Sequence, residues 1–228
     1  FLNGKVLAKC YQKYFFKNKK NFYKIKKFIR FNLSNAKVLL IRNEPPVNQQ
    51  YINSTFFIEQ ISKKVKIINH PRAIREVPEK LFSIRLVKYM PKTLISEDLS
   101  EIKKFFKMNK KVIIKPVNGY SGNGVILLNN FNIKIIKQYL KKYHHIIFQE
   151  YLPKIFYGDR RVFIINGKVK GSITRVPKKG SILSNMSKGA TAKKNKLTYR
   201  ELSISKKVVS LLKKENIYFA GIDFIQER

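Results

Sequence analysis

The stretch Val112-Ile-Ile-Lys-Pro-Val-Asn-Gly-Tyr-Ser-Gly-Asn-Gly-Val-Ile-Leu-Leu128 decides how the rest of the sequence is interpreted. Apolar runs at residues 112–115 and 125–128 flank a turn rich in glycine, which predicts two short strands joined by a permissive loop. The turn lacks the GxxxxGK spacing of a Walker loop. Its backbone amides could still cradle phosphate oxygens while Lys115, at a strand end, neutralises their charge. A plain hairpin is the alternative, and this stretch alone does not choose between the two.

The segments that follow this turn are typical of an antiparallel-rich α+β half. A helix is predicted at residues 133–142 and a strand at residues 146–149. Two further strands, at residues 161–165 and 168–174, are separated by Asn166-Gly167, the strongest signal for a two-residue hairpin.

The last hundred residues also contain a loop and a helix start. Residues 178–196 are polar and contain glycine, so we expect a mobile loop there. Thr198-Tyr-Arg-Glu201 is a capping box that opens a helix, and the segment at 217–225 is predicted to be a buried strand. The inner face of that helix is expected to include Ile204, Val208, Leu211 and Leu212.

The first half of the chain predicts a helix and then a βαβ unit. Residues 1–37 contain no acid, and Tyr11, Tyr14 and Ile25 are among the apolar residues that fall near one face of a helix. Such a basic helix suits a surface position, and membranes or nucleic acid are alternative partners. Strands at 38–41 and 65–68 with a helix at about 53–63 predict a parallel pair. The fold class is therefore α/β, with an α+β second half.

Composition excludes several classes of protein. Apolar residues make up 44% of the 228 positions, which excludes a disordered tail, and no apolar run approaches the length of a membrane span. Cys10 is the single cysteine, which excludes a disulfide framework and a cysteine-built zinc site. We therefore expect a soluble, cytoplasmic protein. The net charge of +36 comes with abundant Lys, Ile, Asn, Phe and Tyr, so A/T-rich codons explain it as well as a polyanion-binding surface does.

Two carboxylates stand out because the chain has only 13 acids. Asp159 lies in Gly158-Asp-Arg-Arg161, where it is either paired with an arginine or functional. Asp223 lies among apolar residues of a predicted strand, and a buried carboxylate needs a cation or a metal. Hard metal ions prefer such oxygen ligands, so Asp223 is the candidate metal ligand.

Beginning at Arg42-Asn-Glu-Pro-Pro46, the sequence resembles the bacterial glutathione synthetase family of the ATP-grasp superfamily. The resemblance then continues in family order over about residues 38–228. The matching motifs are Ile68-Asn-His-Pro71, Glu79-Lys-Leu-Phe82, Pro91-Lys-Thr-Leu94, Ile114-Lys-Pro-Val-Asn-Gly119, Gln149-Glu-Tyr-Leu-Pro153, Gly158-Asp-Arg-Arg161, Thr174-Arg-Val-Pro177, Asn185 and Gly221-Ile-Asp223.

This resemblance implies an ATP-grasp fold and an ATP-dependent ligase that joins γ-glutamylcysteine to glycine through an acyl phosphate. It implies a truncated N-terminal substrate domain at 1–74 and an ATP-grasp domain at 75–228, with a lid subdomain at 75–150 and a C-terminal subdomain at 151–228. It also implies Mg²⁺, or Mn²⁺ in its place, small-molecule substrates and a homo-oligomer, usually a tetramer. No specific nucleic acid and no membrane are expected as partners.

The resemblance also assigns roles to single residues of this sequence. Lys80 and Lys115 would bind the ATP phosphates, with Gly119, Gly122 and Gln149 also at the nucleotide. Further roles would fall to Glu150, Tyr151 and Leu152 as the adenine hinge, Asp159 at the nucleotide or metal, Asp223 at the metal, and Arg161, Arg175 and Asn185 at the phosphates and peptide substrate. Residues 178–196 would form the lid loop.

Some positions depart from the family pattern. Asn118 replaces the usual Asp, Leu183 stands where an arginine is expected, and Ala190 stands where a second glycine is expected. The family's remaining metal ligands would follow Arg228, so we expect a fragment lacking both ends. Two alternatives remain: another ATP-grasp carboxylate–amine ligase, such as a glutamate ligase, or a basic polyanion-binding module without chemistry.

Overall fold

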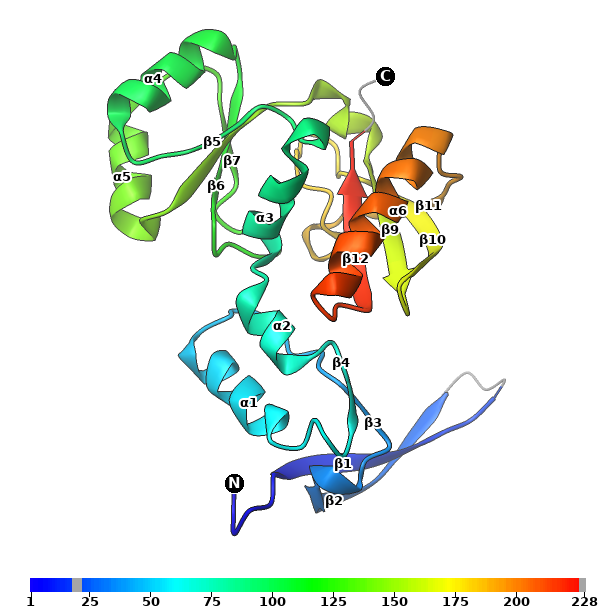
Figure 1. Ribbon diagram of the computed structural model, residues 1–228. Coiled ribbons are helices and arrows are strands. Elements are labelled where there is room, and N and C mark those ends of the chain that lie inside the picture. Colours follow the sequence, from blue (N-terminus) through cyan, green and yellow to red (C-terminus); the bar gives the residue numbers. More distant parts are fainter. Residues whose placement is uncertain (18–21, 226–228) are drawn as a thin grey trace. The chain divides into compact units, whose positions relative to one another are not determined.

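The computed structural model describes residues 1–17 and 22–225 (Figure 1). The chain divides into a first unit, Phe1–Glu44 with Asn48–Glu76, and a second unit, Pro45–Val47 with Val77–Arg228. The last residues of the C-terminal subdomain expected from the sequence, 226–228, lie outside the described part.

The first unit opens with a β-hairpin, so the helix predicted in this region is wrong. Strand β1 (Leu7–Phe15) pairs with β2 (Tyr23–Asn32) in antiparallel fashion, and a short 3₁₀ turn, η1 (Leu33–Asn35), follows. Opposite residues share a face of the pair, so Tyr11 meets Phe28 with ring centroids 5.0 Å apart. Aromatic and β-branched residues favour strands, and these cross-strand contacts override a spacing that also fits a helix.

The rest of the first unit contains the predicted parallel pair. Strand β3 (Val38–Leu40) runs parallel to β4 (Lys66–Ile68), and α1 (Gln49–Glu59) lies between them in sequence. The helix begins earlier than predicted because the Asn48 side chain accepts a hydrogen bond from the Tyr51 amide at 2.9 Å. Helix α2 (Pro71–Glu76) ends this unit. Its small core contains Val6, Ile61 and Val65.

The first half of the second unit is a four-stranded sheet in the order β5-β8-β6-β7, and every neighbouring pair is antiparallel. Helices α4 and α5 pack on it, with Ile102 and Ile136 in a core around Phe148 (Figure 1). Its elements are α3 (Glu79–Phe82), η2 (Ser83–Tyr89), β5 (Thr93–Ile95), α4 (Leu99–Met108), β6 (Val112–Pro116), β7 (Ile126–Leu128), α5 (Ile133–Tyr143) and β8 (Ile146–Glu150).

The second half of this unit is another antiparallel sheet, in the order β11-β10-β9-β12. Asn166 and Gly167 both have positive φ, as the predicted two-residue turn requires, and the capping box of Thr198 with Glu201 starts α6. The elements are η3 (Pro153–Tyr157), β9 (Asp159–Ile165), β10 (Lys168–Val176), η4 (Met186–Lys188), β11 (Thr191–Lys194), α6 (Tyr199–Lys214) and β12 (Phe219–Phe224).

Two predictions about this sheet need correction. The loop expected at 178–196 contains η4 and β11, and β11 pairs with β10 from Thr191 to Lys194. Strand β12 is not fully buried, because it pairs with β9 alone and leaves Asp223 exposed. An outer strand has one neighbour, so its side chains keep contact with solvent.

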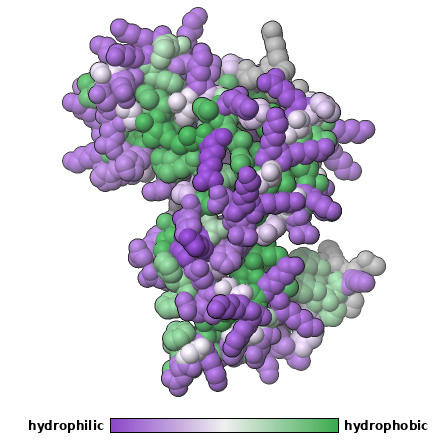
Figure 2. All heavy atoms as spheres, in the orientation of Figure 1, coloured by the Kyte–Doolittle hydropathy of each residue, from purple (hydrophilic) through white to green (hydrophobic). Residues whose placement is uncertain are grey.

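Figure 2 shows hydrophilic side chains spread over the visible face of both units, not gathered into one patch. This distribution matches a composition that raises lysine content everywhere.

Candidate functional site

Lys115 lies at the end of β6 within a chain of oriented polar groups. Its ammonium donates to Oε1 of Gln149 at 2.8 Å, and Nε2 of Gln149 donates to Oγ1 of Thr93 at 2.8 Å. The Thr93 hydroxyl donates in turn to the carbonyl of Pro91 at 2.8 Å. Because the hydroxyl proton is committed to Pro91, the amide must turn its oxygen toward Lys115. The sequence did not assign a role to Thr93, although it belongs to the Pro-x-Thr-Leu motif.

Lys80, on α3, comes to the same place. Its ammonium donates to the carbonyl oxygens of Val117, at 3.1 Å, and of Gly119 in the glycine turn. Burial lowers the pKa of Lys80, and it lowers the pKa of Lys115 to about 8, where the positive charge of Lys80 adds to the effect and Glu79 opposes it. Neither ammonium forms an ion pair with a carboxylate among residues 1–17 and 22–225. Two cations held by neutral oxygens form a site that favours an anion.

The glycine turn packs against the segment that follows β10. Gly122 has φ of +74°, and a Cβ built there would lie 3.0 Å from Oδ1 of Asn185. The ammonium of Lys188 donates to Oδ1 of Asn123 at 3.0 Å. The structure therefore brings Gly119 and Gly122 together with Lys80, Lys115 and Asn185, as the sequence predicted for a shared site.

The backbone after β8 leaves one donor available. The amides of Glu150 and Tyr151 donate to the carbonyls of Lys92 and Lys111, at 2.9 and 3.1 Å. The carbonyl of Leu152 accepts from Ile155 at 3.1 Å, while the Leu152 amide has no partner in the described part of the chain. Tyr151 is buried, which raises its pKa, so its ring serves packing. The free amide and its flanking carbonyls suit the edge of a heterocyclic base.

Asp159 and Arg175 form a buried ion pair on the second sheet, where each is 5% exposed. Nε of Arg175 donates to Oδ1 of Asp159 at 2.8 Å, and Nη2 donates to Oδ2. The hydroxyl of Ser184 also donates to Oδ2, at 2.5 Å. Both oxygens of Asp159 are thus occupied, and the carboxylate acts by holding Arg175; its direct contact with a nucleotide or metal stays a prediction.

Asp223 continues this array on β12. It receives two hydrogen bonds from Arg161, Nε to Oδ1 at 2.7 Å and Nη2 to Oδ2 at 2.6 Å, and Nη2 of Arg175 lies 3.0 Å from Oδ2. The hydrogen bonds from Arg161 to Asp223 raise the pKa of Arg161. The Asp223 side chain is 39% exposed, so the prediction of a buried carboxylate is wrong.

The described residues fit a divalent metal site only in part. Asp223 offers a hard oxygen ligand that faces solvent, but no group of three or more His, Cys, Asp or Glu side chains able to hold a metal occurs within the described ranges. Arginines also occupy both oxygens of Asp223. We therefore derive no chemical step through a metal at this carboxylate.

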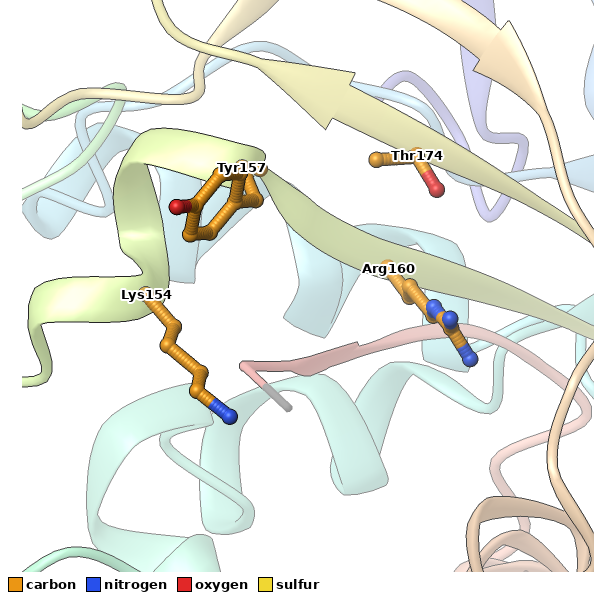
Figure 3. A pocket seen from close by; sticks show the side chains of 5 residues that line it. Lys154, Tyr157, Arg160 and Thr174 are labelled. Carbon is orange, nitrogen blue, oxygen red and sulfur yellow. The ribbon is translucent and has the colours of Figure 1, made fainter. Parts of the chain in front are cut away.

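A hollow of about 370 Å³ lies on the other face of the second sheet (Figure 3). Lys154, Tyr157, Gly158, Arg160 and Thr174 line it, and Arg160 lies opposite Thr174 in the strand register. Successive residues of a strand alternate between faces, so Arg160 points away from Asp159 and Arg161. Arg160 instead donates to Oε2 of Glu201 on α6 at 2.6 Å. The hollow is therefore separate from the site that the sequence predicted.

Family models match nearly the whole chain in two consecutive parts. Residues 1–75 match the model described as "Prokaryotic glutathione synthetase, N-terminal domain", and residues 79–228 match "Prokaryotic glutathione synthetase, ATP-grasp domain". The chain belongs to the prokaryotic glutathione synthetase family. Both the predicted family resemblance and the predicted ATP-grasp fold class are confirmed.

Individual glutathione synthetases agree with this assignment. The chain is 34% identical to that of Bradyrhizobium diazoefficiens, covering 85% of this chain and 63% of the relative. It is 32% identical to that of Buchnera aphidicola subsp. Schizaphis graminum, with 93% and 68% covered, and 34% identical to that of Agrobacterium fabrum, with 98% and 71% covered. The chain thus spans roughly two thirds of the length of these relatives.

Solved structures share the fold at low sequence identity. D-cycloserine synthetase DcsG superposes with a TM-score of 0.66 at 13% identity, covering 86% of this chain and 73% of DcsG. D-alanyl-alanine synthetase A from Vibrio cholerae gives 0.59 at 13% identity, covering 89% and 65%. Ligases with the ATP-grasp fold use ATP and divalent metal ions, and the glutathione synthetase family acts on small molecules. In the part of the chain that the structure describes, no helix is long and apolar enough to span a membrane.

Proposed function

We propose that this protein is an ATP-dependent carboxylate–amine ligase that joins γ-glutamylcysteine to glycine. The observation that carries the proposal is the consecutive match to both glutathione synthetase family models. The unpaired ammonium groups of Lys80 and Lys115 beside the glycine turn support it, because they form a cationic pocket suited to the phosphates of a nucleotide. In this proposal, residues 75–228 form the ATP-grasp domain and residues 1–74 belong to the substrate domain.

The nucleotide would lie against the first sheet of the second unit. Lys80 and Lys115 would contact its phosphates, the amides of Gly119 and Gly122 would add hydrogen bonds, and the amide of Leu152 would meet the base. Gln149 would act by orienting Lys115, since its amide oxygen already accepts from that ammonium. Glu150 and Tyr151 would fix the path of the hinge backbone.

The substrate carboxylate would lie near the second sheet, where Arg161 and Arg175 are held by Asp223 and Asp159. An oxygen of this carboxylate attacks the γ-phosphorus of ATP, and ADP leaves with the electron pair of the broken P–O bond. The glycine amine then attacks the acyl carbon, loses a proton and expels inorganic phosphate. Arg161, Arg175 and Asn185 would stabilise charge on the transferring group. A divalent ion, Mg²⁺ or Mn²⁺, bound near Asp223 would neutralise phosphate charge.

An acyl phosphate hydrolyses readily, so the site must exclude water while the intermediate exists. The segment at 178–196 is the proposed lid, because Asn185 and Lys188 already contact the glycine turn. We further propose a cytoplasmic homo-oligomer, a tetramer as is usual in the family, with ATP, γ-glutamylcysteine and glycine as its ligands and no specific nucleic acid.

A second candidate is another ATP-grasp ligase. The shared fold of DcsG and D-alanyl-alanine synthetase A supports it, because both are ligases with different substrates. The match of residues 1–75 to the N-terminal domain of glutathione synthetase favours the first candidate.

The test measures peptide formation directly by mass spectrometry. The protein is incubated with ATP, MgCl₂, γ-glutamylcysteine and glycine, and in parallel with glutamate or D-alanine as the carboxylate substrate. We expect glutathione, ADP and phosphate in equal amounts, and no product in a Lys115→Met variant. Product from D-alanine or glutamate with none from γ-glutamylcysteine would instead establish the second candidate.

A further inference from the structure

Ser184 is a buried residue within a largely exposed segment. Its exposure is 7%, whereas Met186, Ser187 and Lys188 are exposed. Its hydroxyl donates to Oδ2 of Asp159, the buried carboxylate at the start of β9, at 2.5 Å. A hydrogen bond to a charged acceptor is stronger than one between neutral groups, so this contact fastens the segment to the second sheet.

The carboxylate that Ser184 contacts is the one that holds Arg175. Asp159 binds the Arg175 guanidinium through both oxygens, and that guanidinium reaches Asp223 on β12. Oδ2 of Asp159 therefore accepts from Arg175 and from Ser184 together. Without the hydroxyl, this buried oxygen would lose a donor and the carboxylate would be held less firmly.

The next residue contacts the other sheet. Oδ1 of Asn185 lies 3.0 Å from the position that a Cβ on Gly122 would occupy, at the turn between β6 and β7. Lys188 adds a hydrogen bond to Asn123 in the same turn. Adjacent side chains thus attach one segment to the arginine array on one sheet and to the glycine turn on the other.

We infer that Ser184 is a positioning residue for the ligase reaction, whose hydroxyl holds Arg175 and Asn185 in register across the two sheets. The inference rests on the proposed function, in which both of those residues meet the transferring group. It predicts that loss of the hydroxyl loosens the segment and admits water to the acyl phosphate. The intermediate is then hydrolysed, and phosphate is released without peptide.

Variants at position 184 separate the hydroxyl from simple packing. Ser184→Ala removes the hydroxyl, and Ser184→Cys fills the same space with a weak donor. Ser187→Ala, at an exposed serine of the same segment, is the matched control. The first readout is the rate of trypsin cleavage after Lys178, Lys179 and Lys188 in the protein without ligands, which does not depend on catalysis.

We expect both variants at 184 to be cleaved about tenfold faster in this segment, as loss of a hydrogen bond to a charged group implies. Cleavage after Lys213 should stay at the wild-type rate, which separates local loosening from general unfolding. The second readout is the ratio of phosphate to glutathione, expected to rise several-fold in both variants and to stay at one in Ser187→Ala.

Two results would overturn the inference: wild-type cleavage rates in Ser184→Ala, or wild-type behaviour of Ser184→Cys in both assays. A wild-type protein that makes no glutathione would refute the proposed function, while the cleavage rates would still test the contact between Ser184 and Asp159.

Discussion

The two sheets of the second unit hold their cations in opposite ways. On the first sheet, Lys115 donates to the amide oxygen of Gln149 and Lys80 donates to backbone carbonyls. On the second sheet, each arginine of the array meets a carboxylate, Arg175 with Asp159 and Arg161 with Asp223. Neutral oxygens satisfy the hydrogen bonds of an ammonium without cancelling its charge, whereas carboxylates do both.

This difference separates two tasks. The lysines keep an uncompensated positive charge, which attracts an anion and holds it at the cost of some desolvation. The arginines form a nearly neutral array whose geometry is set before any ligand arrives. The first sheet is therefore suited to bind phosphates, and the second to position substrate groups. Each of the following experiments alters one side of this comparison.

The largest expected effect comes from neutralising Asp159. Asp159→Asn keeps the shape of the side chain but leaves the buried Arg175 with Asp223 as its remaining acidic contact. Loss of one partner from a buried pair destabilises strongly, so we expect the free energy of unfolding to fall by about 3 kcal/mol. Urea titration followed by circular dichroism measures this change.

The control is Glu215→Gln, which breaks a more exposed ion pair with Arg85 in the same unit. Its expected effect is about 0.5 kcal/mol or less. Equal effects of the two variants would show that the buried pair contributes nothing special and would remove this side of the comparison.

The next effect tests the lysine side. Lys115→Met removes the charge and keeps the apolar stem, so affinity for ATP should fall roughly 100-fold by calorimetry, as loss of a charge-assisted contact to phosphate implies. Stability should not decrease, because the buried ammonium opposes folding. Lys110→Met, at an exposed lysine near the start of β6, should bind as the wild type does. Unchanged affinity in Lys115→Met would refute the assignment of this pocket.

A smaller effect should appear as pH rises. The pKa of Lys115 lies at about 8, below the ordinary value of 10.5, so the free protein loses this charge above that pH. Bound phosphates favour the charged form, so nucleotide affinity should weaken by up to about tenfold for each pH unit above 8. Lys80 and Glu79 are the charged groups that act on Lys115. Calorimetry between pH 7 and 9.5 tests this, and a wild type whose affinity does not change with pH over that range contradicts it.

The same pKa has a defined consequence for stability. The unfolded chain keeps Lys115 protonated up to about pH 10.5, while the folded chain releases the proton above about 8. Between those values the unfolded state binds more protons, so stability should rise with pH over this window. The Lys115→Met variant lacks this contribution and provides the reference curve.

Much of the second unit could be predicted from local signals. The apolar runs around the glycine turn, the Asn166-Gly167 turn and the Thr198 capping box each act over a few residues, and the structure contains all three elements. Resemblance to the family selected Lys80, Lys115 and Asn185 as members of one site, and the structure brings their surroundings together.

The remaining features depend on partners distant in sequence. The residues at 7–32 fit a helical spacing, but the pairing of Tyr11 with Phe28 decides for strands. Asp159 has Arg160 and Arg161 as sequence neighbours, yet its partner is Arg175 across a hairpin, because strand alternation sends Arg160 to the other face. Ser184 carries no local signal, since its hydrogen bond to Asp159 spans 25 positions.

The Asn166-Gly167 hairpin also bears on the order in which the chain assembles. It joins β9 to β10, so Asp159 and Arg175 leave the ribosome within one short loop of each other, well before β12 is made. Tight hairpins close quickly, because little chain entropy is lost when a short loop forms. We expect the Asp159–Arg175 pair to form during synthesis and to present a finished edge of β9, onto which β12 adds Asp223 as the last part of the array.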